Sequence, residues 1–135
     1  MAIGQWIVDK SAVARLTQPG AEDLLAELPG PLYLCQVGEL EQLYSARSSH
    51  DYDDLKSHMH ASFEIAKSPA DILDRALTLQ RDLAHHHGMW HRIPIPDLLI
   101  AETALHHEMG VVHVDADFDR IAEVRPLMVR RLRVK

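Results

Sequence analysis

The sequence is poor in features that mark several specialised classes of protein. It has a single cysteine, Cys35, so no disulfide can form within the chain, and a reducing cytoplasm is the simplest compartment. No apolar run approaches the roughly 20 residues that a membrane-spanning helix needs. The opening "MAIGQWIVDKSAV" lacks the basic start and the long apolar stretch of a signal peptide. We therefore expect a soluble, cytoplasmic protein that makes no contact with a membrane.

Internal repeats, low-complexity tracts and long linkers are also missing. The chain of 135 residues suits one hydrophobic core, and we expect a single domain over residues 1–135. Hydrophobic residues make up 47% and charged residues 25%, as is usual for globular proteins. Neither a glycine-rich phosphate loop nor a Ser-His-Asp arrangement is visible, so the sequence does not indicate a nucleotide-binding loop or a serine hydrolase.

Charge is unevenly distributed along the chain. The formal net charge of −6 argues against non-specific binding of polyanions. However, residues 120–135 contain six basic residues and one acidic residue, Glu123. This segment is either a solvated edge strand, on which charge prevents aggregation, or a patch for a nucleic-acid backbone or an acidic partner. Charge alone favours the edge strand.

Short apolar stretches alternate with helical patterns. Strands are expected at 6–9, 111–114 and 126–134, and "LYLC" at 32–35 is either a brief strand or the lead-in to a helix. Helices are expected at 11–16, 21–28, 37–48, 51–62, 69–88, 96–109 and 117–124. Ser68 can cap one of these helices, and Gly110 can close another. The alternation predicts an α/β sandwich with a mostly parallel central sheet flanked by helices.

Acidic residues follow the strongest strands. Asp9 ends "WIVD" and Asp115 ends "VVHVD", and ligands bind beyond the carboxyl ends of parallel strands. Asp97 lies in the first turn of a predicted helix and Glu41 lies inside another. Each acid alone has a structural explanation, as a helix cap, a partner of the helix dipole or a surface charge. Gathered together, they would raise one another's pKa unless a hard cation such as Mg²⁺ or Mn²⁺ neutralised them.

Four stretches of the sequence resemble the motif blocks of one family. "IVDKSAVARL", "LEQLYSAR", "IPDLLIAETAL" and "VVHVDADFDRIAEV" are similar to those of PIN-domain ribonucleases, specifically the VapC toxins of bacterial toxin–antitoxin pairs. The blocks come in the family's order and span nearly the whole chain. Lys10 stands where many relatives have Thr, and Pro96 replaces a commoner small residue. The resemblance implies a PIN-like fold and a Mg²⁺- or Mn²⁺-dependent endoribonuclease that leaves a 5′-phosphate.

The resemblance also assigns roles to individual acids. It implies that the catalytic residues are Asp9, Glu41, Asp97 and Asp115, of which the three aspartates are also metal ligands. Asp117 would be an additional ligand, directly or through water.

Further residues would support or border these acids. Ser11 would hydrogen-bond to the acids, whereas Arg47 and Arg120 either contact RNA phosphates or are exposed helix charges. Glu39 is the rival of Glu41, but the family's acid precedes "xLY", which selects Glu41. Asp119 is expected to be solvated.

The resemblance further implies partners. These are an RNA substrate and a cognate, VapB-like antitoxin whose tail covers the active site. A homodimer or a higher toxin–antitoxin assembly is also implied, with the helices at 21–28 and 51–62 offering apolar and charged faces. A helix that faces the core would show the same pattern.

Two observations compete with this interpretation. The histidines of "HHHGMWH" (85–91) and "ALHHE" (104–108) suggest zinc, but His85 and His86 are neighbours that point apart, and a loop or cap role is favoured. The resemblance makes this segment a border of the site, where Trp90, His91 and Arg92 would contact RNA. His113 is expected to be a packed core or rim residue. The alternative function is a non-catalytic, Mg²⁺-binding signalling or interaction module, although a signalling module would need a lysine that the second half lacks until Lys135.

Overall fold

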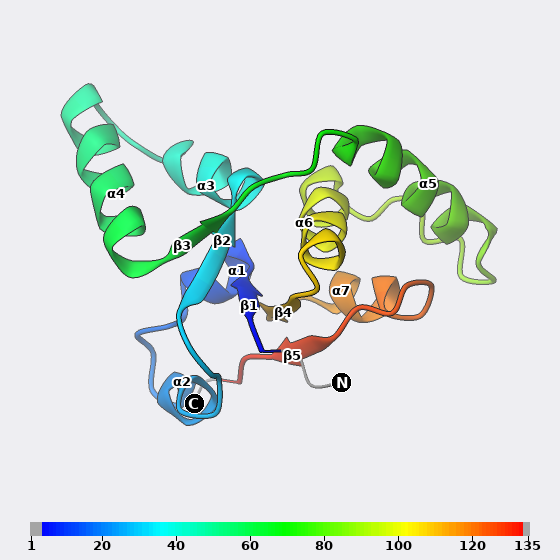
Figure 1. Ribbon diagram of the computed structural model, residues 1–135, viewed down its shortest axis with the longest axis horizontal. Coiled ribbons are helices and arrows are strands. Elements are labelled where there is room, and N and C mark those ends of the chain that lie inside the picture. Colours follow the sequence, from blue (N-terminus) through cyan, green and yellow to red (C-terminus); the bar gives the residue numbers. More distant parts are fainter. Residues whose placement is uncertain (1–3, 134–135) are drawn as a thin grey trace.

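The computed structural model describes residues 4–133 and has a five-stranded sheet between two layers of helices (Figure 1). All four strand pairings are parallel, and the strand order is β3-β2-β1-β4-β5. The predicted α/β class is therefore confirmed. The strands are β1 (Trp6–Val8), β2 (Leu32–Cys35), β3 (Glu64–Ala66), β4 (Gly110–His113) and β5 (Val129–Arg131).

Side chains alternate between the two faces of the sheet, and both faces are buried. Ile7 and Val111 pack into a core shared with α5, α6 and α7, whereas Trp6, Val8 and Val112 pack against α1 and α2. Burial on both faces explains why the central strands are continuous apolar runs. The helices are α1 (Lys10–Val13), α2 (Ala21–Leu25), α3 (Gln36–Leu43), α4 (Ser49–Ser62), α5 (Ile72–His85), α6 (Ile95–His106) and α7 (Ala116–Ile121).

The strand order creates a binding crevice at a defined place. The chain runs from β1 outward to β2 and β3, and then returns to the opposite side of β1 for β4 and β5. Direction therefore reverses between β1 and β4, and α/β sheets bind ligands beyond the carboxyl ends of strands at such a switch point. Val8 pairs with Val112, and the Asp9 amide donates to the Val112 carbonyl at 2.9 Å. Asp9 thus lies at the switch point.

The start of α5 and the strand before it differ from prediction. Residues 64–66 form β3, where the sequence indicated no strand. The predicted cap by Ser68 is wrong, because α5 begins at Ile72 and the Ser68 amide instead donates to Gln36 Oε1 at 3.0 Å. A tertiary contact therefore replaces the local cap.

The end of α6 also differs from prediction. The helix ends at His106, and Glu108 adopts the left-handed conformation expected of a closing glycine, with φ of 57°. Gly110 instead begins β4, where a Cβ atom would lie 2.5 Å from Cζ3 of Trp6. This glycine is required for close packing rather than for a turn.

The basic C-terminal segment forms the edge strand β5. Arg130 forms an ion pair with Glu27, and Nη2 of Arg131 lies 3.2 Å from Oδ2 of Asp119. These acidic partners favour the interpretation of a solvated edge over that of a free basic patch. Lys135 lies outside the described residues. None of the described helices has the length and apolar character that crossing a membrane requires.

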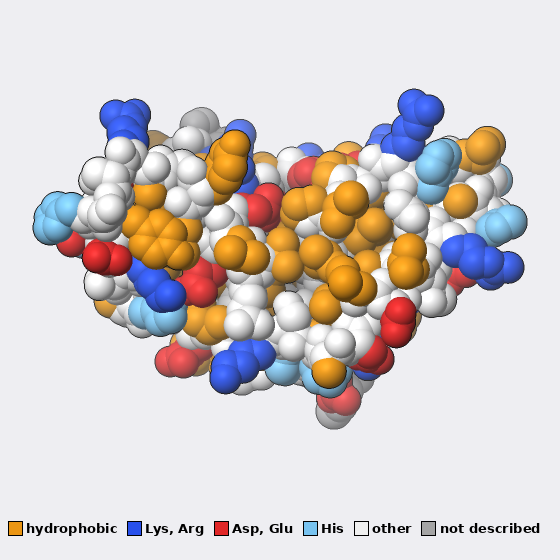
Figure 2. All heavy atoms as spheres, turned by 90° about the horizontal axis from the view of Figure 1, so that it is seen from above, with side chains coloured by type: hydrophobic (Ala, Val, Ile, Leu, Met, Phe, Trp, Pro, Cys, Tyr) orange, Lys and Arg blue, Asp and Glu red, His pale blue; other side chains and the backbone are white. Residues whose placement is uncertain are grey.

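The surface has an apolar face on α5 and α6. Of the helices considered for partner binding, α2 turns Ala21 and Leu24 into the core. Three large apolar side chains of α5 and α6, Leu73, Leu77 and Ile95, are each more than 60% exposed and border a groove of about 350 Å³, the apolar groove. Figure 2 shows hydrophobic side chains gathered on this side of the molecule. Exposed apolar faces of this kind are suited to partner binding.

Candidate metal centre

An open cleft of about 420 Å³ lies at the switch point, and its wall is acidic. All four acids that the sequence predicted to be catalytic line it, although they come from distant parts of the chain. Asp9 is 4% exposed and Asp97 is 7% exposed. The lining residues are Asp9, Lys10, Ser11, Ala14, Arg15, Glu41, Gln42, Pro94, Asp97 and Asp115.

Asp9 is held in place by Ser11. Asp9 ends β1 and caps α1, so its Oδ2 accepts hydrogen bonds from the Ser11 amide at 3.0 Å and from the Ser11 hydroxyl at 2.6 Å. The same hydroxyl accepts a bond from the Val114 amide at 3.1 Å. Ser11 therefore joins the ends of β1 and β4 and fixes the distance between their acids.

Replacement of Ser11 with Ala should loosen this junction. We expect the free energy of unfolding to fall by about 1–2 kcal/mol, because two part-buried hydrogen bonds are lost. Affinity for Mn²⁺ should fall roughly tenfold, since groups that orient metal ligands contribute at least that much. Urea unfolding and calorimetric titration measure the two effects. The control is Ser45→Ala, which removes an exposed hydroxyl bonded to the Gln42 carbonyl; equal effects of both variants would contradict the assigned role.

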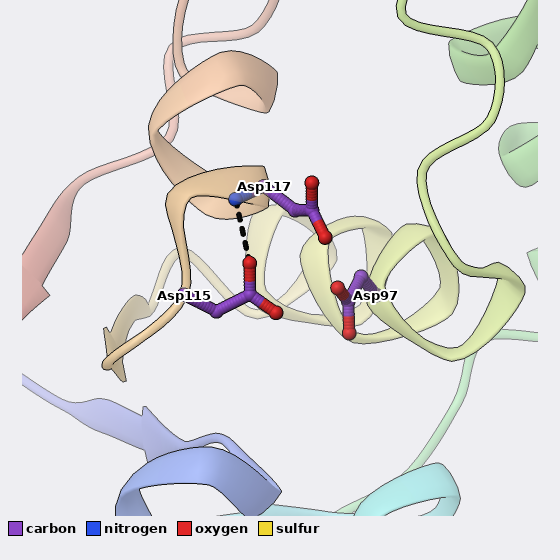
Figure 3. Close-up of side chains that lie close together, drawn as sticks. All are labelled: Asp97, Asp115 and Asp117. Carbon is purple, nitrogen blue, oxygen red and sulfur yellow. Dashed lines mark hydrogen bonds between the residues drawn. The ribbon is translucent and has the colours of Figure 1, made fainter.

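Three aspartates converge on one point at the α6 and α7 ends of the cleft (Figure 3). One carboxylate oxygen from each of Asp97, Asp115 and Asp117 lies within 4.8 Å of the other two. Asp115 caps α7 by accepting a bond from the Asp117 amide at 2.7 Å. Capping and metal binding are compatible here, because Figure 3 shows the second oxygen of Asp115 turned toward Asp97.

Burial and mutual repulsion raise the pKa values of these acids. The pKa of Asp97 rises to about 8, chiefly because burial disfavours its charge, and then because of the charges on Asp9 and Asp115. Burial and then Asp9 raise the pKa of Glu41, while burial and then Asp115 raise that of Asp117. Asp97 therefore holds a proton at neutral pH that an ordinary surface carboxylate would release.

The donor atoms fit a hard divalent cation. Among the described residues, Asp97 Oδ2 and Glu41 Oε1 are buried without a hydrogen-bond partner, and both acids line the cleft. Oxygen-only ligands suit Mg²⁺ and Mn²⁺, and a cation would compensate the buried charge. Within residues 4–133, the one group of three or more candidate ligands that lie this close together contains no histidine, so it differs from a zinc site.

The two glutamates of α3 point to different partners. Glu41 lines the cleft, whereas the Glu39 carboxylate pairs with His60 of α4. The placement agrees with the selection of Glu41 over Glu39, although the catalytic role of Glu41 stays a prediction.

The two predicted arginines also occupy different places. Arg120 Nη1 lies 3.3 Å from Asp117 Oδ1, and its guanidinium carbon lies 5.7 Å from the centre of the Trp90 ring. Arg47 instead lines a separate groove at the turn between α3 and α4, together with Tyr52. Arg120 therefore borders the acids, and Arg47 does not line their cleft.

The histidine-rich loop has a packing role. Trp90 stacks on His86 with ring centres 4.3 Å apart, and the Trp90 amide donates to the Leu83 carbonyl at 2.9 Å. These contacts close the loop after α5, in agreement with the predicted loop and cap role.

His113 and Asp119 form a support that sequence reasoning missed. His113 is fully buried, as expected, and its Nδ1 accepts a bond from the Asp115 amide at 3.2 Å. Its Nε2 lies 3.4 Å from Asp119 Oδ1. Asp119 is half-exposed, and its contacts with His113 and Arg131 replace the purely solvated role expected of it. The pairing was not visible in the sequence because it depends on how α7 folds back over β4.

The fold and the site together define an α/β protein with a candidate divalent-cation centre at the switch point of a parallel sheet. The chain matches the family model described as PIN domain over residues 7–124. It is 56% identical over 125 residues to Ribonuclease VapC17 of Mycobacterium tuberculosis, with 90% of each chain covered. It is 35% identical over 122 residues to Ribonuclease VapC21 of the same organism, with 89% of this chain and 88% of the relative covered.

Solved structures share the fold at low sequence identity. VapBC-1 from nontypeable Haemophilus influenzae has a TM-score of 0.75 at 18% identity, covering 94% of this chain and 97% of that one. VapBC2 from Rickettsia felis, bound to a DNA fragment from the promoter, has a TM-score of 0.72 at 18% identity, covering 95% and 98%. The chain belongs to the PIN domain family, and within it to the VapC group.

Proposed function

We propose that the protein is a metal-dependent endoribonuclease and the toxin of a toxin–antitoxin pair. The observation that carries this function is the convergence of buried, unpartnered carboxylate oxygens on an open cleft at the switch point. The relatives named as VapC ribonucleases, the nearer of which is 56% identical over 125 residues, support the same activity. RNA phosphodiesters are thus the proposed substrate, and hydrolysis the proposed reaction.

The acids of the cleft would hold a divalent cation. We assign Asp9, Asp97 and Asp115 as ligands of Mg²⁺ or Mn²⁺, with Asp117 completing the site directly or through water. When bound, such a cation supplies an activated water and offsets charge on the phosphate. Glu41, half-buried and close enough to Asp9 for that charge to raise its pKa, would accept a proton from an attacking water.

Other residues orient the acids or contact RNA. Ser11 holds Asp9 through its hydroxyl and amide. Arg120, held between Asp117 and Trp90, is assigned to a phosphate near the scissile bond. Arg47, in its separate groove, is assigned to a more distant part of the RNA.

The proposed partner is a VapB-like antitoxin. Among the solved structures with the same fold, VapBC-5 from Mycobacterium tuberculosis is a member of the VapBC family of toxin–antitoxin systems. The apolar groove on α5 and α6 offers a surface for a protein partner or for a second copy of the chain. We propose a cytoplasmic location, because the lone Cys35 thiol is buried and forms no disulfide.

Incubation of the purified chain with total RNA tests the function. Cleavage should occur with Mg²⁺ or Mn²⁺ and stop when a chelator removes them, because the carboxylates need a cation to bind a polyanion and to activate water. RNA fragments are resolved by electrophoresis. Cleavage that survives chelation would contradict the mechanism, and intact RNA under all conditions would favour a non-catalytic module.

A further inference from the structure

The acidic cleft has a basic rim that lies on the α1 side. Lys10 and Arg15 line the same cleft as Asp9 and Glu41. Building on the proposed ribonuclease function, we infer that Lys10 and Arg15 bind backbone phosphates of single-stranded RNA and hold the strand over the acids. Neither residue follows from the family's motif, in which Thr is common at the position of Lys10.

The charges of these two residues are available to a ligand. Within residues 4–133, no carboxylate lies within 4.0 Å of a charged nitrogen of Lys10 or Arg15. Arg130 and Arg131, in contrast, are paired with acids of their own chain. An arginine that is paired with a carboxylate, as Arg120 is with Asp117, must share or lose that partner when it binds phosphate, whereas the rim cations Lys10 and Arg15 have no such cost.

Arg15 is also fixed in direction. Its Nη1 donates to the Ser11 carbonyl at 2.5 Å, and the Ser11 hydroxyl bonds to Asp9. Ser11 therefore connects the Arg15 guanidinium to the proposed metal ligand Asp9. The remaining N–H groups of the guanidinium are not used by the bond to Ser11. A planar guanidinium held in this way is suited to a bidentate contact with phosphate, and little side-chain entropy is lost on binding.

Lys10 does not act mainly to neutralise the acids. Its charge lowers the pKa of Glu41, but burial and Asp9 outweigh it, and that pKa remains raised. Lys10 is exposed at the rim, where a flexible ammonium can follow a mobile phosphate.

The overall charge makes such a rim necessary. The chain has a formal net charge of −6, and the cleft wall is rich in carboxylates, so the protein repels a polyanion at long range. A bound cation compensates only the acids that it touches. RNA that extends beyond the scissile phosphate therefore needs positive charge at the edge of the cleft, and Lys10 and Arg15 supply it.

RNA binding tests the inference independently of cleavage. All variants carry Asp97→Asn, so that RNA stays intact, and a fluorescently labelled single-stranded RNA oligonucleotide is titrated in Mg²⁺ over a series of KCl concentrations. Lys10→Gln and Arg15→Gln should each weaken binding about tenfold, as expected for one charge-assisted contact. Each should also reduce the slope of log affinity against log salt by about 0.7, the value for one phosphate of a single strand.

Matched controls and a second readout separate binding from folding. Lys56→Gln on α4 and Arg81→Gln on α5 remove exposed charges that do not line the cleft, and they should leave affinity and slope unchanged. Without Asp97→Asn, the rim variants should raise KM for RNA and leave kcat within about twofold, as expected for loss of uniform binding.

The outcomes distinguish this inference from the proposed function. If the double variant Lys10→Gln and Arg15→Gln binds RNA with unchanged affinity and slope while the unaltered chain cuts RNA, the rim is not an RNA-binding surface and the ribonuclease assignment stands. If the unaltered chain cuts no RNA with either metal, the ribonuclease function is overturned, and the affinities and salt slopes of the rim variants still decide whether Lys10 and Arg15 bind RNA.

Discussion

Asp97→Asn should abolish RNA cleavage and, without metal, make the folded chain more stable at pH 8. Asp97 is 7% exposed, lies among four other carboxylates and keeps one oxygen without a hydrogen-bond partner. Removal of a ligand should lower the cleavage rate at least about 100-fold, since even groups that only orient ligands contribute 10- to 100-fold. Removal of its buried charge should raise the free energy of unfolding by roughly 1–3 kcal/mol at pH 8.

The gain in stability should depend on pH. The folded pKa of Asp97 is raised to about 8 from an ordinary value of 3.8, so between these values the folded chain holds a proton that the unfolded chain has released. Stability of the metal-free chain therefore falls as pH rises from about 3.8 to about 8, because the unfolded state binds fewer protons. The variant lacks this contribution, so its advantage should be large at pH 8 and small at pH 5.

Urea unfolding at the two pH values and cleavage of a defined RNA measure these effects. Asp54→Asn on α4 is the matched control, because this exposed carboxylate lines neither the cleft nor the groove that contains Arg47. It should leave cleavage and stability unchanged. Cleavage by Asp97→Asn at the rate of the unaltered chain would show that the catalytic assignment is wrong.

Binding of a divalent cation should strengthen as pH rises toward 8 and should release protons. The raised pKa values of the ligands Asp97 and Asp117 mean that the cation competes with protons for the same oxygens. Below pH 8 affinity should fall progressively, by up to about tenfold per pH unit for each proton displaced. Above pH 8, Asp97 should no longer contribute to the pH dependence of the cation affinity.

Calorimetric titration with Mn²⁺ in two buffers of different ionisation enthalpy counts the protons released. The unaltered chain should release protons at pH 6.5 and fewer at pH 8.5, whereas Asp97→Asn should bind weakly and release fewer at both. The bound cation should also raise the unfolding temperature of the unaltered chain. Binding that is equally strong in Asp97→Asn, or independent of pH, would place the cation outside this cleft.

The central strands and the acids that end them were predictable from local patterns. "WIVD" and "VVHVD" are apolar runs followed by an acid, and parallel strands bring their carboxyl ends together, so the proximity of Asp9 and Asp115 followed directly. The family's motif then selected Glu41, and the cleft contains Glu41 rather than Glu39. These predictions depended on hydrophobic periodicity and on the order of the motifs, and both can be recognised from the sequence alone.

The features that were missed depend on contacts between distant segments. The three residues of β3 are too few to show a periodic pattern, and Ser68 bonds to Gln36 across 32 residues instead of capping α5. The helix cap was a sound local expectation, but a tertiary hydrogen bond replaced it.

The rim of the cleft was missed for the same reason. Arg47 and Arg120 were chosen because they adjoin motif blocks, whereas Lys10 and Arg15 become neighbours of Glu41 only when α1 and α3 pack together. Charge along the sequence cannot show which cations face the acids.

The most direct test of the central claim is the chemistry of the cut ends. A defined single-stranded RNA is cleaved by the purified chain in Mn²⁺, and the fragments are identified by mass spectrometry. Attack of water on phosphorus, with the 3′-oxygen as leaving group, should leave a 5′-phosphate on the downstream fragment and a 3′-hydroxyl on the upstream one. A 2′,3′-cyclic phosphate would show that the RNA's own 2′-hydroxyl is the nucleophile, and it would contradict hydrolysis by water in the acidic cleft.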